Sequence, residues 1–431
     1  MSGTAPGAAP GTAPGTEPGA ASGAPVRDVV VVGASAGGLA TVEGLRRGGF
    51  TGRITLVGAE PHMPYDRPPL SKQVLAGQWE PDRLPLRPPS DIEALDLDLR
   101  LGVTATGVDP RARTVALDTG EEVPYDVLVA ATGVSPRRLP GGGGHVLRDL
   151  EDALVLRDRL RPGRRLAVVG AGFLGAEAAA VARGLGCEVT MVEPAPVPLA
   201  HAVGAQVGEV LTQVHRERGV DLRTGAGVTQ VHDGGLELGD GTTVEADDVL
   251  VAVGSVPNTG WLELGGLPVA DGLVCDEFCE AAPGVYGVGD VARWENPLFG
   301  VSMRIEHRTH AAEQGLAVAR NLLDPGAARP FAPVPYFWSD QYELKIQAYG
   351  YLRGHEEVRI VEGDLAERRC LAAYRTGDRL VGVLAIGMPP RALRPWRRDI
   401  AAGAAWHDAV GDLPDGVITT TREVVSDVAT A

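Results

Sequence analysis

The chain has 431 residues, a formal net charge of −16 and a hydrophobic content of 44%. This length accommodates about two to three domains with large cores, and the acidic balance argues against a nucleic-acid-binding protein. Four cysteines are too few for a disulfide framework, the apolar runs are too short to span a membrane, and the first residues do not form a secretory signal, so we expect a cytoplasmic protein.

Residues 1–25 have glycine at every fourth position from Gly3 to Gly23, with Pro and Ala between. A segment with so little apolar surface cannot offset the chain entropy that folding removes. We predict a disordered tail without chemistry, with a docking role as the alternative.

A glycine-rich motif follows the apolar run at residues 29–32, which predicts a buried strand. The motif is Gly33-Ala34-Ser35-Ala36-Gly37-Gly38, and an Ala- and Leu-rich helical stretch comes next. Such a turn brings backbone N–H groups and a helix N-terminus up to a pyrophosphate. Ser35 replaces the usual second glycine, and its small side chain still permits a close approach. Glu60, at the end of the next apolar run, lies at the distance where a carboxylate accepts hydrogen bonds from ribose hydroxyls.

The next segment carries a proline-rich loop, a short helix and then strands. We predict the loop at 61–69, the helix at 70–75, hairpin strands at 99–108, 114–117 and 122–125, a buried strand at 127–131, and a flexible joint at 141–144.

The same succession of elements then repeats. After a helix from Asp149 and a strand at 166–169 comes Gly170-Ala171-Gly172-Phe173-Leu174-Gly175, and Glu193 ends the following strand. Ordinary strand-to-helix turns with chance glycines are the alternative for either motif alone. Two motifs, each with its acid, indicate a protein that holds two dinucleotides. No Arg or Lys occurs between Glu193 and Gln206, which favours NADH over NADPH.

The remaining chain contains further strands and two more helices. We predict a long helix at 202–218, a strand at 249–254 that echoes 127–133 and suggests one domain inserted in another, a helix at 309–322, strands at 345–349, 358–361, 371–374 and 380–386, and a basic helix near 392–401.

Five further motifs carry a family resemblance. They are Pro64-Tyr65-Asp66-Arg67-Pro68-Pro69-Leu70-Ser71-Lys72, Ala131-Thr132-Gly133-Val134-Ser135-Pro136-Arg137, Gly287-Val288-Gly289-Asp290, Arg304-Ile305-Glu306-His307 and Tyr336-Phe337-Trp338-Ser339-Asp340-Gln341-Tyr342. On these motifs the chain, from Val26 to about Thr420, resembles the FAD-dependent, NADH-linked ferredoxin reductases of bacterial oxygenase systems, of the putidaredoxin reductase and biphenyl dioxygenase reductase type.

The resemblance implies an α/β fold with two Rossmann-like dinucleotide-binding domains, as in glutathione reductase, and a small C-terminal α+β domain. The FAD domain would comprise residues 26–139 and 260–331, with the NADH domain inserted at 140–259. The C-terminal domain, residues 332–425, would cover the flavin and help to form the partner surface. FAD and NADH are the implied cofactors.

The resemblance also implies roles for individual residues. Lys72 would lie beside the reactive edge of the flavin, paired with Glu177, and Asp290 would bind the ribityl or pyrophosphate region. Arg67 and Arg137 would contact FAD, and Trp338 would pack near the ring. A solvated lysine, a carboxylate that complements a helix dipole, surface arginines and a core tryptophan are the alternatives. The remaining implied cofactor positions are Val103, Thr132, Gly133, Gly254, Glu306 and His307.

The cysteines bear on the electron acceptor. None occurs between Val26 and Gly186, Cys187 is expected to be buried in a strand, and Cys275 and Cys279 are expected to be structural residues of a loop. No internal thiol relay is evident, so we expect an external acceptor to approach the flavin. His307 and His310 with Glu306 do not complete the ligand set of a metal site.

The resemblance implies a small ferredoxin-type carrier as that acceptor, serving a P450 or Rieske oxygenase. An acidic carrier would need a basic patch, for which Arg391, Arg394, Arg397 and Arg398 are the candidates, with Arg46, Arg47 and Arg308 as possible additions. Arg308 replaces the tryptophan that usually follows Glu-His in this family. A solvated basic face is the alternative, and a quinone or small organic radical as acceptor, an NADH-sensing flavoprotein of the apoptosis-inducing-factor type, and a monomer or homodimer all stay open.

Overall fold

The computed structural model describes residues 26–140, 142–411 and 419–420. The predicted tail at 1–25, Gly141 of the predicted joint, and residues 412–418 and 421–425 of the predicted C-terminal domain lie outside the described residues. Within those ranges, no helix combines the length and the apolar character that a membrane span needs.

The first of three layered units is built on a six-stranded sheet with the order β18-β19-β7-β1-β2-β3. All neighbours pair in parallel except β18, which is antiparallel to β19. Because β19 pairs with β7, segments on either side of a long intervening stretch share one sheet. The strands are β1 (Asp28–Val32), β2 (Arg53–Gly58), β3 (Asp98–Leu101), β7 (Val127–Ala130), β18 (Glu280–Ala282) and β19 (Val285–Gly287).

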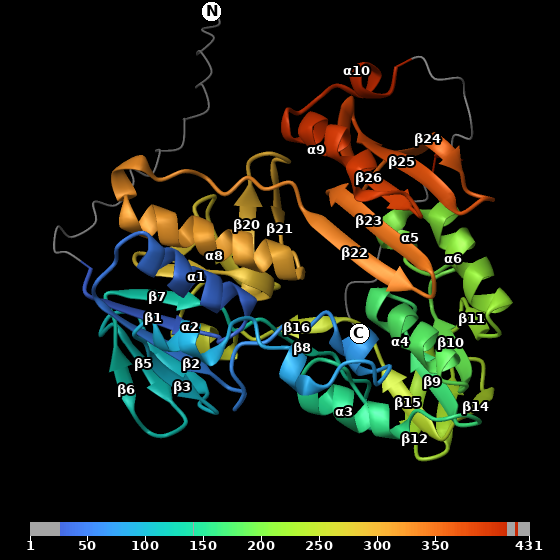
Figure 1. Cartoon of the computed structure of the whole chain (residues 1–431), viewed down its shortest axis with the longest axis horizontal. Coiled ribbons are helices and arrows are strands. Elements are labelled where there is room, and N and C mark those ends of the chain that lie inside the picture. Colours follow the sequence, from blue (N-terminus) through green and yellow to red (C-terminus); the bar gives the residue numbers. More distant parts are fainter. Residues whose placement is uncertain (1–25, 141, 412–418, 421–431) are drawn as a thin grey trace, which may run out of the picture.

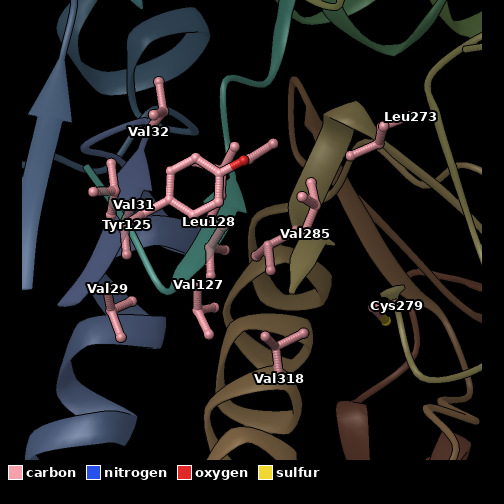
Figure 2. Close-up of a cluster of buried hydrophobic side chains, with 14 of the residues drawn as sticks. Val29, Val31, Val32, Tyr125, Val127, Leu128, Leu273, Cys279, Val285 and Val318 are labelled. Carbon is pink, nitrogen blue, oxygen red and sulfur yellow. The ribbon is translucent and has the colours of Figure 1, made fainter. Parts of the chain in front are cut away.

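Helices α1 (Ala36–Arg47) and α8 (Arg308–Leu323) lie side by side next to this sheet (Figure 1). They approach closely because Gly44 has no side chain: a Cβ there would lie 2.7 Å from the Cβ of Ala319. Figure 2 shows Val29, Val31 and Leu128 from neighbouring strands with Val318 of α8 in the same buried cluster. The antiparallel strands β4 (Ala105–Asp109), β5 (Thr114–Leu117) and β6 (Glu122–Pro124) pack on the same core.

The second unit has a four-stranded parallel sheet with the order β11-β10-β9-β15. Helices α3 and α4 bury their apolar residues against one part of it, and the antiparallel strands β12–β14 pack on a separate cluster. The elements are α3 (Leu150–Arg159), β9 (Arg165–Val169), α4 (Phe173–Gly184), β10 (Glu188–Glu193), β11 (Asp221–Thr224), β12 (Val228–His232), β13 (Gly235–Leu238), β14 (Thr243–Glu245) and β15 (Asp248–Val251).

The third unit is a six-stranded antiparallel sheet with the order β22-β23-β26-β25-β24-β27. It joins the second unit through a shared cluster with α6 (Ala205–Glu217), and the Tyr374 hydroxyl donates to the Val203 carbonyl at 2.7 Å. Its elements are β22 (Tyr336–Gln341), β23 (Leu344–Gly350), β24 (Glu357–Asp364), β25 (Arg369–Thr376), β26 (Arg379–Ile386), α9 (Arg394–Ala401), α10 (Trp406–Val410) and β27 (Thr419–Thr420).

The remaining elements are short, and several of them pack on the core of the first unit. They are the π-turn η1 (Leu70–Val74), 3₁₀ turns at Pro81–Arg83, Gly289–Val291, Pro325–Ala327 and Pro390–Leu393, helices α2 (Pro89–Glu93) and α7 (Gly260–Glu263), the pair β8 (Val134–Pro136) and β16 (Ser255–Pro257), and strands β17 (Leu273–Cys275), β20 (Ala292–Asn296) and β21 (Val301–Met303).

Three expectations from the sequence are wrong in detail. The stretch 99–108 is two strands, because the chain turns at Gly102, and β3 joins the parallel sheet rather than a hairpin. The helix predicted at 202–218 is interrupted at Gly204, whose φ of 86° ends α5 (Ala200–Val203) before α6 (Ala205–Glu217). Cys275 ends strand β17 instead of lying in a loop.

Candidate functional site

One cavity of ≈ 800 Å³ takes its lining from all three units. This volume lies in the upper part of the range of about 300–1,000 Å³ that is usual for ligand pockets. Its lining contains more Arg and Lys than Asp and Glu side chains, although the chain as a whole is acidic. The cavity therefore suits an anionic ligand such as a dinucleotide.

Helix α1 opens directly into this cavity. Its N-cap residue Ser35 makes no capping hydrogen bond through its side chain, no acid lies in the first turn, and Ser35 and Ala36 line the cavity. The turn closes only with glycines: a Cβ at Gly33 would lie 2.0 Å from the Ala131 carbonyl oxygen, and one at Gly38 would lie 1.9 Å from that of Gly33. Uncapped N–H groups at a helix start bind phosphate, so this end fits a dinucleotide.

Helix α4 repeats this arrangement from the second unit. Its N-cap Gly172 has no side chain to cap the helix, and Gly172 and Phe173 line the same cavity. Gly170 and Gly175 pack as tightly as their counterparts, since added Cβ atoms would lie 2.4 and 2.1 Å from backbone oxygens. Two helix starts that lack capping side chains therefore open into one space.

The two predicted ribose-binding acids bind protein groups in this structure. Glu193 accepts hydrogen bonds from the backbone N–H of Ala171 at 2.7 Å and of Ala195 at 2.9 Å. Glu60 accepts from the Tyr65 hydroxyl and pairs with Arg67. Neither acid is among the cavity-lining residues.

Lys72 and Glu177 form an ion pair in the cavity wall. The Lys72 Nζ lies 2.6 Å from the Glu177 Oε2, and their side chains are only 13% and 6% exposed. Turn η1 brings Lys72 there because Leu70 and Val74 are buried in the same core as α3 and α4. Ser71 also donates to Oε2, at 2.6 Å, and Ser339 donates to Oε1 at 2.7 Å.

Asp290 lies in the cavity wall at the start of a 3₁₀ turn. Burial raises the pKa of its carboxyl group, an effect that the nearby Arg148 guanidinium opposes from 3.1 Å. Arg67 donates to the Arg148 carbonyl at 2.9 Å and also lines the cavity. We missed Arg148 in the sequence, where the available signal was its place one residue before Asp149, the N-cap of α3.

Aromatic rings surround the remaining wall. The ring of Phe337 lies between His307 and Phe173, with centroid distances of 5.4 and 4.8 Å, and burial lowers the pKa of His307 to about 4. Trp338 lines the cavity and stacks on Tyr336 at 5.9 Å. Gly133, Gly254 and Glu306 contribute to the lining as well.

Other predicted positions lie outside the cavity lining. The Thr132 hydroxyl donates to the Asn258 carbonyl at 2.9 Å, and the backbone N–H of Val103 donates to Gly58 at 3.0 Å. Arg137 is exposed and donates to the Ser255 carbonyl at 3.3 Å. Four predicted glycines do not line the cavity but permit the close backbone contacts that shape the two turns beside it. They are Gly33, Gly38, Gly170 and Gly175.

The residue that replaces the usual family tryptophan has a clear partner. Arg308 lines the cavity and forms an ion pair with Asp66 at 2.9 Å. Arg353 enters the same lining from the third unit, and we did not anticipate it from the sequence.

All four cysteines lie in the described part of the chain, where they are free and buried, and none lines the cavity. Across the described ranges, no cluster of three or more His, Cys, Asp or Glu side chains could hold a metal ion.

Comparisons with known proteins agree on one family. The model of the pyridine nucleotide-disulphide oxidoreductase family matches residues 27–315, and the reductase C-terminal family matches residues 336–412. The chain is 39% identical over 346 residues to the ferredoxin–NAD(+) reductase component of the p-cumate 2,3-dioxygenase system from Pseudomonas putida, covering 79% of this chain and 84% of that protein. It is 37% identical over 391 residues to the ferredoxin–NAD(+) reductase component of the anthranilate 1,2-dioxygenase system from Burkholderia cepacia, covering 87% and 94%. The reductase in a crystal structure of the covalent putidaredoxin reductase–putidaredoxin complex superposes with a TM-score of 0.84 and 33% identity, covering 90% and 96%.

Proposed function

Because the chain belongs to the pyridine nucleotide-disulphide oxidoreductase family, and within it to the ferredoxin–NAD(+) reductases that use FAD and NAD(P)H, we propose that it transfers a hydride from NADH to FAD and then single electrons to a ferredoxin-type carrier. That carrier would serve a P450 or Rieske oxygenase. The relatives from P. putida and B. cepacia are named as the reductase components of dioxygenase systems.

One observation carries this proposal. Two helix starts without side-chain caps open into a single cavity, the buried Lys72–Glu177 pair lies in its wall, and the lining contains no cysteine among the described residues. Two dinucleotides can therefore meet there, and without a thiol to receive them the electrons must leave to a separate molecule.

The cavity residues fit FAD at the α1 end. The N–H groups at the start of α1 would hold the FAD diphosphate. Asp290, which is oriented by its ion pair with Arg148, would accept hydrogen bonds from the FAD hydroxyl groups. When bound, FAD accepts a hydride from a reduced nicotinamide and returns electrons singly. The Lys72 ammonium would stabilise negative charge that develops at the ring, and Glu177 would orient that ammonium. The apolar rings of Phe173 and Phe337 would exclude water beside it.

We extend the proposal to the domains and to the nucleotide. The sheet order supports an FAD domain at 26–139 and 260–331 around an NADH domain at 140–259, followed by a reductase domain from 332. NADH is favoured over NADPH because a carboxylate, Glu193, ends β10 and no Arg or Lys follows it before Gln206.

The docking surface of the carrier is proposed at α9. Arg394, Arg397 and Arg398 of this helix are exposed, and so is Arg391 in the 3₁₀ turn before it. A row of rings links this helix to the cavity: Trp338 stacks on Tyr336, Tyr336 packs on Tyr349 at 4.7 Å, and the Arg397 guanidinium lies 5.5 Å from the Tyr349 ring. Tyrosine, tryptophan and arginine are the residues that protein interfaces favour. Arg46 is a poor addition to this surface, because its guanidinium donates to four backbone carbonyls.

A coupled assay tests the acceptor. FAD-loaded protein, NADH and cytochrome c should react slowly alone and many times faster when an acidic [2Fe–2S] ferredoxin is added. A quinone or organic radical that is reduced faster than every ferredoxin tried would favour the alternative acceptors. A long-lived complex with NADH and slow turnover with all acceptors would favour a sensing role.

A further inference from the structure

A chain of buried side chains leads away from the Lys72–Glu177 pair and reaches none of the predicted site residues. Ser339 donates to the Glu177 Oε1 at 2.7 Å, and Gln341 Nε2 donates to the Ser339 hydroxyl at 3.3 Å. Gln341 Oε1 lies 3.2 Å from His215 Nε2, and His215 Nδ1 lies 2.9 Å from the Tyr342 hydroxyl. Ser339, Gln341 and His215 are each 0% exposed.

The chain crosses between two units. Phe337, Ser339 and Gln341 alternate along β22, so they share one face of the strand, and that face contacts the second unit. Glu177 lies on α4 and His215 on α6. The link therefore fixes the third unit against the two helices that carry its partners, and Figure 1 shows β22 next to α4.

The chemistry of the end groups sets the direction of every hydrogen bond. The Glu177 carboxylate can only accept, so the Ser339 hydroxyl must donate to it and must in turn accept from Gln341. The Gln341 carbonyl oxygen then faces His215 Nε2, which must carry the proton. Burial lowers the pKa of His215 to about 4, so the ring is neutral and its bare Nδ1 accepts from Tyr342. Every donor in the chain thus points toward Glu177.

We propose that Ser339, Gln341 and His215 are positioning residues for flavin reduction, which hold the Glu177 carboxylate, and through it the Lys72 ammonium, in the orientation that hydride transfer requires. This inference rests on the proposed role of the Lys72–Glu177 pair. A carboxylate that keeps one oxygen for the ammonium needs its other oxygen satisfied elsewhere, and Ser339 supplies that hydrogen bond. Gln341 restricts the rotation of the Ser339 hydroxyl by donating a hydrogen bond to it, and His215 holds the Gln341 amide in place from the other side.

Anaerobic stopped-flow measurement of flavin reduction by NADH tests the inference on the FAD-loaded protein. Ser339→Ala should lower the limiting reduction rate about tenfold, which corresponds to about 1.4 kcal/mol in the barrier, with little change in the apparent Kd for NADH. Ser339→Thr, which keeps the hydroxyl group, should restore most of the rate. His215→Phe should have a similar effect to Ser339→Ala, and the double variant should be no slower than either single variant because both break the same chain.

Thr212→Val is the matched control, since Thr212 is buried on α6 near His215 and bonds only the Gly208 carbonyl. It should keep the wild-type rate. If the rate losses of Ser339→Ala and His215→Phe multiply in the double variant, the inference is overturned. It is also overturned if Ser339→Ala reduces flavin at the wild-type rate while Lys72→Met is slow. In both cases the proposed role of the Lys72–Glu177 pair stands. A rate loss in Ser339→Ala that merely follows loss of FAD would also overturn the inference, by showing a structural role. Unchanged rates in both Lys72→Met and Glu177→Gln would instead contradict the proposed role of the pair.

Discussion

Lys72 and Glu177 lie in contact, 2.6 Å apart between Nζ and Oε2, although 105 residues separate them in the chain. The lysine comes from a turn that follows a proline-rich loop, and the glutamate comes from a helix of another unit. Their meeting requires the packing of η1 on α3 and α4, so the pair depends on the relative placement of the two dinucleotide-binding units.

Replacing Lys72 by methionine should slow flavin reduction by NADH roughly 100-fold, the usual effect of removing one group that stabilises transition-state charge. The rate is read by anaerobic stopped-flow absorbance. Lys345→Met is the matched control, because Lys345 is the chain's other lysine and is exposed on β23. Equal rates in the two variants would remove Lys72 from the mechanism.

Reversing charge on α9 should weaken binding of the carrier. The double variant Arg394→Glu/Arg397→Glu should raise the KM for an acidic ferredoxin about tenfold at low salt and flatten its dependence on salt. Reduction of ferricyanide, which needs no docking, should stay the same. Arg111→Glu controls for net charge, because Arg111 is exposed in a turn that is distant from α9 in the sequence. An equal effect of Arg111→Glu would show that α9 is not the docking surface.

Glu193 should set the preference for NADH. Glu193→Gln removes the repulsion of a 2′-phosphate. Its one amide oxygen keeps an acceptor for either the Ala171 or the Ala195 N–H group, which bond different oxygens of the native carboxylate. We expect kcat/KM for NADPH relative to NADH to rise about tenfold. Steady-state assays with both nucleotides measure the ratio, and an unchanged ratio would place the discrimination elsewhere.

Stability should fall in mild acid. Burial lowers the pKa of His215 to about 4 and of His310 to about 3, from an ordinary value of 6.5. Below pH 6.5 these histidines are protonated in the unfolded chain but stay neutral in the native state, so the free energy of unfolding decreases as the pH falls toward 4. Each histidine contributes about 2 kcal/mol of this loss between pH 7 and pH 5. Urea unfolding of His310→Phe should show a smaller pH dependence than the wild type, and parallel curves would be inconsistent with a buried neutral His310.

Asp248 should be a structural anchor of the second unit. Its side chain is 3% exposed, and although burial raises its pKa, hydrogen bonds from Arg164, Arg159 and His145 outweigh that effect and hold the pKa below the usual range. Asp248→Asn should lower the free energy of unfolding by about 2 kcal/mol. Glu245→Gln, in an exposed pair with Arg165, should change it little. Comparable urea midpoints for the two variants would contradict this assignment.

Local patterns in the sequence located most of the elements, because each dinucleotide unit repeats strand, glycine turn, helix and strand. The glycines at 33, 38, 170 and 175 were readable because their spacing is that of a tight strand-to-helix turn, in which Gly38 lies against Gly33 and Gly175 lies against Gly170. The break at Gly204 was not readable, since glycine also occurs inside helices, and only its positive φ identifies the interruption.

The site was less predictable where it depends on tertiary contacts. The one local signal for Arg148 was its place before the N-cap of α3, and that position does not indicate the ion pair with Asp290. Ser339 and Gln341 stood inside a recognised motif, but their shared strand face and their link to His215 arise only when the third unit packs on α4 and α6. Prediction of such contacts needs the docking of units, which periodicity does not encode.

An anaerobic titration of the FAD-loaded protein with NADH tests the central claim, that two dinucleotides meet in one cavity without an internal thiol acceptor. We predict that one equivalent of NADH per FAD fully bleaches the flavin absorbance, with one equivalent of NAD(+) formed. Failure of NADH to bleach the flavin, or consumption of a second equivalent by another redox centre in the protein, would contradict the account.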